Sequence, residues 1–247
     1  MGMELSLEGS RFVTHARNVM AAVSAARRAQ LTENKALNGV IRVGLTYTVS
    51  GYFLPRHYTR FARNYPNIHV KLHELPRVAI EDGLKNGVLD IAVMLVSNLH
   101  DRDAIATETL FRSRRRLWLP VEHPLLEAES VDIADVAAVP YIMLSVDEAH
   151  TTATKYWAPS GFYPNVIFTT SSVEAVRSMV ADGLGVTILS DMVYRPWSLE
   201  GQRIEQRNLV TPIPTMDVGL AWRKATPLAA ATQAFADFIG VSVSGGV

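Results

Sequence analysis

The 247-residue chain contains no cysteine, which excludes disulfide bonds, thiolate metal sites and a cysteine nucleophile. It has no excess of either charge, because 24 lysine and arginine residues balance 24 aspartate and glutamate residues. A free-standing nucleic-acid-binding domain usually carries a basic excess, so we expect this chain alone to bind DNA poorly. No window approaches the roughly 18 consecutive apolar residues of a membrane span, and Met1–Gly9 lacks the basic start and apolar stretch of an export signal. We therefore predict a cytoplasmic protein that does not contact membranes.

The N-terminal part of the chain has a long helical pattern. Residues 10–31 hold no glycine or proline and many helix-forming residues. Apolar positions follow alternating steps of four and three, as in a heptad seam of about three repeats: Phe12, Ala16, Val19, Val23 and Ala26. Such a seam either packs on the chain's own domain or pairs with a second copy in a homo-oligomer, and the pattern leaves both open. Residues 1–38 are predicted to be a linker or dimerisation helix, ended by Asn38-Gly39.

Beyond Gly39, predicted strands and helices alternate, which indicates an α/β fold with parallel crossovers. The first set has strands at Val40–Leu45, Ile68–Leu72 and Leu89–Val96, and helices at Gly51–Tyr65 and Val78–Asn86. The second set has strands at Arg116–Pro120, Tyr141–Leu144, Val166–Thr169, Gly185–Leu189 and Val218–Trp222, and helices at Asp147–Ala158, Ser172–Ala181 and Thr226–Phe238. Pro227 is expected to open the last helix, and residues 241–247 are expected to fray.

These two sets predict two α/β lobes with a cleft between them, because no flexible linker separates them. The expected limits are 39–115 with 218–247 for regulatory subdomain I, and 116–217 for regulatory subdomain II. Ligands in such sheets bind beyond the carboxyl ends of the strands, so we expect a small-molecule site in the cleft.

The sequence offers little for catalysis or for a cofactor. His69 and His73 are the closest histidines, but four residues of strand separate them by about 13 Å, too far to share a metal ion. There is no G-x-S-x-G nucleophile motif and no phosphate-binding P-loop. Gly183-Leu-Gly185 follows a predicted helix and precedes a strand, so we interpret it as a helix cap and tight turn. We expect no enzyme, no metal and no cofactor, with Glu74 left open as a carboxylate in the cleft.

Four arginines crowd the segment FRSRRRLWL, at Arg112, Arg114, Arg115 and Arg116. The pattern favours a solvated strand edge, where such charges are common. The alternative is a site for an anion or an acidic partner.

Hydroxyl-rich turns occur at corresponding places in the two predicted lobes. Thr46 and Thr48 follow the first strand and precede a helix, and Thr170 and Ser171 do the same in the second lobe. Ser97 follows the third strand. Hydroxyls and free N–H groups at helix N-termini favour an anion such as a carboxylate, but the same groups also serve as plain helix caps. Because two such turns lie in matching positions, the pattern leaves two interpretations open: the hydroxyls line a shared ligand cleft, or they only cap helices.

Five segments, in order from about Leu5 to Phe238, resemble motifs of the LysR-type transcriptional regulators. LSLEGSRFVTHARNV resembles the start of that family's linker helix, and VIRVGLTYTVSGYFLPRHYTRFARNYPNIHVKLHE resembles the opening of its effector-binding domain. NGVLDIAV, LWLPVEHPL and SSVEAVRSMVADGLGVTILS resemble three further motifs of the same domain. Each motif is weakly specific by itself, but their order and spacing together are typical of the family.

The resemblance implies a periplasmic-binding-protein-like (type 2) fold, with two subdomains joined by crossover strands and preceded by the linker helix. It further implies a small effector between the subdomains and a homo-oligomer. DNA would be bound only through an N-terminal winged helix-turn-helix, which this chain does not contain. The family's effector-binding positions correspond to Thr46, Thr48, Pro76 or Arg77, Ser97, and Thr170 or Ser171. Arg77 departs from the small polar residues usual in the family and is expected to pair with a ligand carboxylate. A stand-alone solute-binding protein of the same fold is the alternative.

Overall fold

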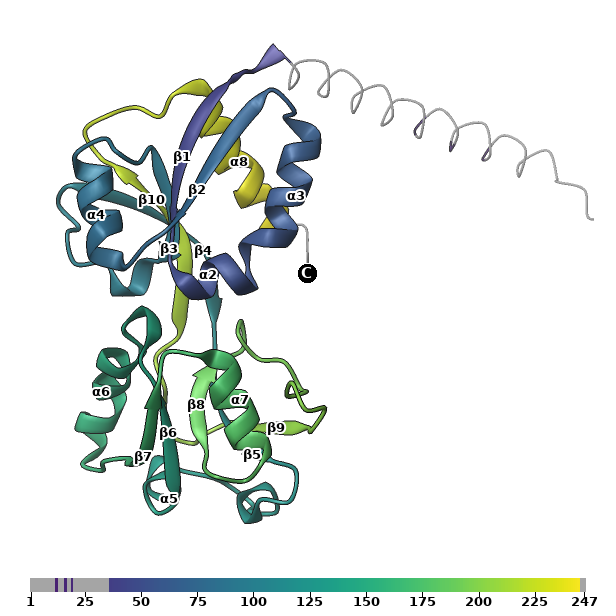
Figure 1. The fold of residues 1–247 in the computed structure, drawn as a ribbon, viewed down its shortest axis with the longest axis vertical. Coiled ribbons are helices and arrows are strands. Elements are labelled where there is room, and N and C mark those ends of the chain that lie inside the picture. The colour runs from purple at the N-terminus through teal and green to yellow at the C-terminus, as the bar shows by residue number, and fades with distance from the viewer. Residues whose placement is uncertain (1–11, 13–15, 17–18, 20–35, 245–247) are drawn as a thin grey trace, which may run out of the picture.

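The computed structural model describes Phe12, Ala16, Val19 and residues 36–244 of the chain. Residues 36–244 form two α/β lobes, which lie one above the other in Figure 1 and are joined where strands pass between them. This is the two-lobed α/β architecture that the sequence predicts.

The upper lobe is built on a five-stranded sheet with the order β2-β1-β3-β10-β4. Its strands are β1 (Gly39–Leu45), β2 (Ile68–Glu74), β3 (Ile91–Leu95), β4 (Ile105–Ser113) and β10 (Met216–Arg223). β1 pairs in parallel with β2 and β3, whereas β10 runs antiparallel to β3 and β4. Every residue of β3 is buried, as expected for a central strand that is covered on both faces.

Helices cover both faces of this sheet. They are α2 (Tyr47–Tyr52), α3 (Leu54–Asn64), α4 (Arg77–Lys85) and α8 (Ala230–Ser244), and a 3-10 turn η1 (Val96–Asn98) follows β3. α3 and α8 share one core with β1, in which the rings of Phe61 and Phe235 meet edge to face at 5.1 Å. α4 packs Ile80 and Leu84 into a second core with Met94 of β3.

The lower lobe contains two smaller sheets. β5 (Arg115–Pro120) lies between β8 (Thr187–Ser190) and β9 (Ile204–Arg207), antiparallel to both, and β6 (Pro140–Leu144) pairs in parallel with β7 (Asn165–Thr170). A single bridge between Tyr141 and Val186 links the two sheets. The helices are α5 (Ile133–Ala137), α6 (Ala149–Ser160) and α7 (Val173–Ala181), with 3-10 turns η2 (Pro124–Leu126) and η3 (Val146–Glu148).

Two strands carry the chain between the lobes. β4 continues through Arg114 into β5, and the chain returns to the upper lobe along β10, which pairs with β4. The predicted division into 39–115 with 218–247 and 116–217 stays a prediction, and the strands lie close to its limits but do not coincide with them. The five-stranded sheet takes its strands from Gly39–Ser113 and Met216–Arg223, and the smaller sheets take theirs from Arg115–Arg207.

Several expected boundaries were wrong. β4 and β9 were not predicted, and the helix expected at Gly51–Tyr65 is two helices separated at Phe53. Pro227 does not open α8, which begins at Ala230, and Leu228, which precedes that helix, packs against the upper core. Residues 241–244 do not fray but belong to α8, where Ser242 is buried and Val243 packs against the core. Residues 245–247 lie outside the described residues.

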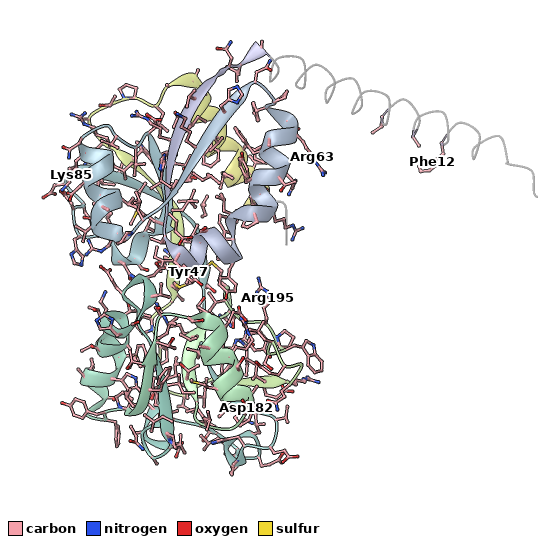
Figure 2. The ribbon with its side chains drawn as sticks, viewed as in Figure 1. Phe12, Tyr47, Arg63, Lys85, Asp182 and Arg195 are labelled. Atoms are coloured by element: carbon pink, nitrogen blue, oxygen red, sulfur yellow. The ribbon has the colours of Figure 1, made fainter. Side chains whose placement is uncertain are left out.

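The described part of the N-terminal segment is helical and exposed. Phe12, Ala16 and Val19 are helical, with Phe12 73% and Val19 62% exposed. Phe12 and Val19 therefore do not pack on the chain's own lobes, and Figure 2 shows Phe12 away from both lobes. The other two predicted seam residues, Val23 and Ala26, lie outside the described residues.

Candidate functional site

Thr46 follows directly after β1 and forms the N-cap of the short helix α2. It is 2% exposed, and its hydroxyl has no hydrogen-bond partner among the residues that the structure describes. Thr46 lines a cleft together with Pro76 and Arg77 of the upper lobe and residues 145–148 of the lower lobe. We call this space the outer cleft. A buried hydroxyl without a partner is unfavourable, so this side of the cleft has an unused hydrogen-bonding group.

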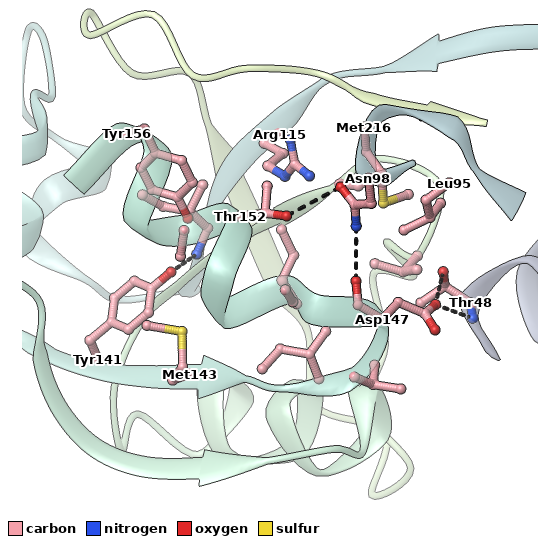
Figure 3. Close-up of a pocket in the computed structure, with 18 residues that line it drawn as sticks. Thr48, Leu95, Asn98, Arg115, Tyr141, Met143, Asp147, Thr152, Tyr156 and Met216 are labelled. Atoms are coloured by element: carbon pink, nitrogen blue, oxygen red, sulfur yellow. Dashed lines mark hydrogen bonds between the residues drawn. The ribbon is translucent and has the colours of Figure 1, made fainter. Parts of the chain in front are cut away.

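A narrower space adjoins the outer cleft and extends into the lower lobe; we call it the inner cavity (Figure 3). Its wall is mostly apolar and includes Tyr141, Met143 and Tyr156, while Asn98, Arg115 and Thr152 supply polar groups. Four residues line both spaces and so form the wall between them: Leu95, Asn98, Val146 and Asp147. The outer cleft is the wider of the two spaces.

Asp147 of the lower lobe binds the upper lobe through its carboxylate. Oδ2 accepts hydrogen bonds from the Thr48 hydroxyl at 2.5 Å and from the Thr48 backbone N–H at 2.8 Å, and Oδ1 accepts from the Tyr47 N–H at 3.1 Å. Its backbone carbonyl accepts from the Asn98 side chain at 3.0 Å (Figure 3). The chain's own carboxylate therefore occupies the position at Thr48 where the sequence led us to expect a ligand anion.

Arg77, the first residue of α4, pairs with two carboxylates of the chain itself. Its guanidinium lies 2.7 Å from Glu81 of the same helix and 2.8 Å from Glu148 of the lower lobe. The hydrogen bonds to Glu148 and Glu81 raise the pKa of Arg77, although burial acts in the opposite direction. The structure thus gives Arg77 the carboxylate pairing expected of it, but with internal partners and as a contact between the lobes.

A further contact joins the lobes on α2 and α7. The Tyr52 hydroxyl donates to Glu174 at 2.7 Å, and Arg177 pairs with the other oxygen of the same carboxylate. Burial and the hydrogen bond to Glu174 raise the pKa of Tyr52 to about 12. Burial would raise the pKa of Glu174, but the hydrogen bonds from Arg177 and Tyr52 outweigh it, and the pKa is lowered. Glu174 is therefore ionised while it holds the two lobes together.

Three predicted site residues lie away from both spaces. Ser97 accepts a hydrogen bond from the Asp217 backbone N–H at 3.3 Å and lines neither the outer cleft nor the inner cavity. The Thr170 hydroxyl accepts from the Ser172 N–H at the start of α7, and Ser171 is exposed. The second hydroxyl-rich turn thus serves the capping of α7, where the Ser172 hydroxyl accepts from the Ala175 N–H. The structure brings Thr46, Thr48 and Arg77 to the cleft, but not Ser97, Thr170 or Ser171.

The arginine cluster is not a uniform strand edge. Arg112 lies on the edge strand β4 and pairs with Asp217, whereas Arg116 lies on the central strand β5 and pairs with Asp191. Arg114 is exposed, and Arg115 lines the inner cavity. The four neighbours therefore have four different surroundings, which the run of identical residues could not indicate.

In the described part of the chain, no three histidine, aspartate or glutamate side chains lie close enough together to hold a metal ion. No helix in the same residues is long and apolar enough to cross a membrane.

The chain is similar in sequence and in fold to transcriptional regulators. YwbI, an uncharacterized HTH-type transcriptional regulator of Bacillus subtilis, is 26% identical over 198 residues, which cover 80% of this chain and 64% of the relative. The chain thus spans less than two thirds of that relative's length. The crystal structure of HinK, a LysR family transcriptional regulator from Pseudomonas aeruginosa, superposes with a TM-score of 0.76 at 26% identity, covering 97% of this chain and 81% of HinK.

Two structures that share only the fold contain a small molecule. The effector-binding domain of QuiR in complex with shikimate has a TM-score of 0.70 at 20% identity, covering 85% of this chain and 99% of QuiR. The BenM effector-binding domain with its effector benzoate has a TM-score of 0.71 at 18% identity, covering 83% of this chain and 92% of BenM. Residues 34–242 also match the family model described as the LysR substrate binding domain. The chain therefore belongs to the LysR family, and residues 34–242 are its substrate-binding domain.

Proposed function

We propose that this domain senses a small organic anion that binds between the lobes and contacts both of them. The observation that carries the proposal is Thr46, whose buried hydroxyl lines the outer cleft without a partner among the described residues. A ligand oxygen at this place would accept the hydrogen bond that the folded chain leaves unmade. QuiR and BenM support the chemistry, because shikimate and benzoate are both carboxylates.

The contacts between the lobes supply the means of response. Asp147 on Thr48, Glu148 on Arg77 and Glu174 on Tyr52 all join one lobe to the other. A ligand shifts the balance between lobe arrangements only by binding one arrangement better than another. A ligand anion near Thr46 would lie beside the Asp147 carboxylate, and the two negative charges repel each other. We therefore expect the ligand to bind best to a lobe arrangement in which the Asp147 carboxylate has moved away.

The experiment compares Thr46→Val with Thr154→Val, an exposed position on α6, by calorimetric titration of benzoate and of shikimate. Valine keeps the shape of threonine but cannot donate. A lost hydrogen bond to a charged group costs about 1.5–3 kcal/mol, so Thr46→Val should weaken binding by about ten- to a hundredfold. Without ligand its melting temperature should not fall, because the hydroxyl has no partner to lose. If Thr46→Val binds benzoate or shikimate as tightly as the wild type does, Thr46 does not contact the ligand.

We further propose that the whole protein is a cytoplasmic DNA-binding regulator that acts as a homo-oligomer, with DNA contacted by a domain other than the substrate-binding domain. The relatives are named as transcriptional regulators, which supports this over a stand-alone solute-binding protein. No catalytic role is proposed. An exposed apolar strand, β7, supports self-association, because Val166, Ile167 and Phe168 are 42%, 51% and 43% exposed.

A further inference from the structure

Arg115 is an arginine of the inner cavity that the proposed function does not yet use. It begins β5 at the passage between the lobes and is half-buried. The guanidinium has five N–H donors, and the structure gives it one hydrogen bond, from Nη1 to the Pro214 carbonyl. Its neighbours Arg112 and Arg116 each pair with an aspartate, but within the described part of the chain no carboxylate forms an ion pair with Arg115.

The wall opposite this charge is suited to an apolar group. Tyr141 and Met143 lie across the cavity from Arg115 in Figure 3, whereas Met216, Asn98 and Thr152 line it on the side of Arg115. Burial lowers the pKa of Arg115, although Tyr156, Tyr141 and Asp217 act in the opposite direction. An arginine stays protonated in proteins, so the cavity keeps a positive charge with unused donors.

The one carboxylate in the wall of the cavity does not neutralise that charge. Asp147 directs its oxygens to Thr48 and Tyr47, which already supply three hydrogen bonds. A second acid group on a ligand would lie near Asp147 and be repelled by it. The cavity therefore selects for one negative charge and for an apolar remainder.

We propose that the inner cavity binds a small monocarboxylate, with its carboxylate on the Arg115 guanidinium and its apolar part against Tyr141, Met143 and Met216. This inference rests on the proposed function, in which an anion binds between the lobes, and it places a monocarboxylate in the inner cavity, which Thr46 does not line. As it stands, the cavity has room for only about three water molecules. Because Asp147 and Val146 separate it from the outer cleft, a ligand of benzoate size needs this wall to move as it enters.

The test titrates benzoate and butanoate, with benzamide and butanamide as neutral partners of the same shape, into the wild type, Arg115→Met, Arg115→Lys and Arg114→Met. Arg114 is the matched control, because it is the exposed neighbour. We expect the acids to bind and the amides to bind at least tenfold more weakly. Arg115→Met should weaken acid binding by about ten- to a hundredfold. Arg115→Lys should weaken it less, because lysine keeps the charge but lacks the paired N–H donors of the guanidinium. Arg114→Met should not change acid binding measurably.

Circular dichroism and melting temperature establish whether each variant is folded. If Arg115→Met does not fold, Arg115→Lys still tests the role of the guanidinium. Equal affinity for benzoate and benzamide, unchanged acid binding in the Arg115 variants, or no binding of either acid at millimolar concentration would overturn the inference. Shikimate binding that depends on Thr46 but not on Arg115 would leave the proposed function standing and remove this site. Acid binding that depends on Arg115 but not on Thr46 would support this site and show that Thr46 has no part in it.

Discussion

At the scale of single residues, Asp147 and Glu148 have the most unusual backbone of the described chain. Both are left-handed, with φ of 51° and 61°, and they are the two non-glycine residues there with positive φ. Such a conformation costs about 1–3 kcal/mol per residue and persists only where the surroundings hold it. Here each strained residue has its carboxylate fixed by the other lobe, Asp147 by Thr48 and Glu148 by Arg77. The strain and the contact between the lobes are thus coupled.

We predict that Asp147→Asn loosens the contact between the lobes. Asparagine tolerates the left-handed conformation, so the change removes the charge and one acceptor without adding strain. Weaker hydrogen bonds to Thr48 and Tyr47 should lower the free energy of unfolding by about 1–3 kcal/mol. Urea unfolding measures this loss, and X-ray scattering should show a larger radius of gyration. The control is Asp182→Asn at the exposed end of α7; if both variants behave alike, Asp147 does not hold the lobes together.

A site residue could be predicted where the neighbouring sequence marks it, and could not be predicted where its role depends on a partner far away in the chain. Thr46 was predicted to lie at the cleft because a hydroxyl between a strand and a helix is visible in the sequence. Ser97 was predicted there too, but one step along η1 turns Ser97 toward Asp217 and Asn98 toward the cleft. Asp147 was read as the start of a helix, and its partner Thr48 is 99 residues away, so no local pattern pointed to it. Arg115 differs from its three neighbours only in what the folded chain places around it.

At the scale of elements, patterns that arise from burial were predictable, and patterns that arise from distant pairing were not. β3 is a continuous apolar run and was found. β4 reads IATETLFRS with mostly exposed or half-buried residues, and it becomes a strand through its pairing with β10, about a hundred residues later. β9, with four residues and one buried apolar side chain, is fixed in the same way by β5.

The pairing of β4 with β10 depends on Gly219, which lies at the irregular register between Val218 and Gly219. A Cβ atom there would overlap the backbone oxygen of Glu108 on β4 and lie 2.9 Å from the Val96 side chain. We predict that Gly219→Ala lowers the free energy of unfolding by about 2–4 kcal/mol, because backbone atoms must shift in the strand pair that joins the lobes.

The matched control is Gly51→Ala in α2, where an added Cβ meets nothing within 4 Å. Alanine should leave stability unchanged or raise it by about 0.5–1 kcal/mol, because it favours the helix more than glycine does. Chemical denaturation of both variants under one set of conditions measures the difference. If Gly219→Ala is as stable as Gly51→Ala, the backbones of β4 and β10 can shift at this point at little cost in free energy.

At the scale of the whole molecule, two separately packed lobes are joined by a strand pair and by polar contacts between them. Each lobe has its own buried clusters, so the contacts between lobes can change without unfolding either one. The inner cavity lies behind the wall that contains Asp147, and Thr46 lies in front of it. A ligand that enters from the outer cleft must therefore disturb a contact that holds the lobes, which links binding to lobe movement.

The last prediction concerns association of whole chains. Phe12 and Val19 lie on the predicted heptad seam and are largely exposed, so a second copy is the natural cover for them. We expect the chain to sediment as a homo-oligomer, most simply a dimer, at micromolar concentration. Replacing both residues by serine should lower the oligomeric state without lowering the melting temperature of the lobes, because neither side chain packs on them. Val121→Ser, at another exposed apolar position, is the control and should sediment like the wild type. A monomeric wild-type chain, or a double variant that still associates fully, would show that the seam is not the oligomerisation surface and leave the exposed strand β7 as the next candidate.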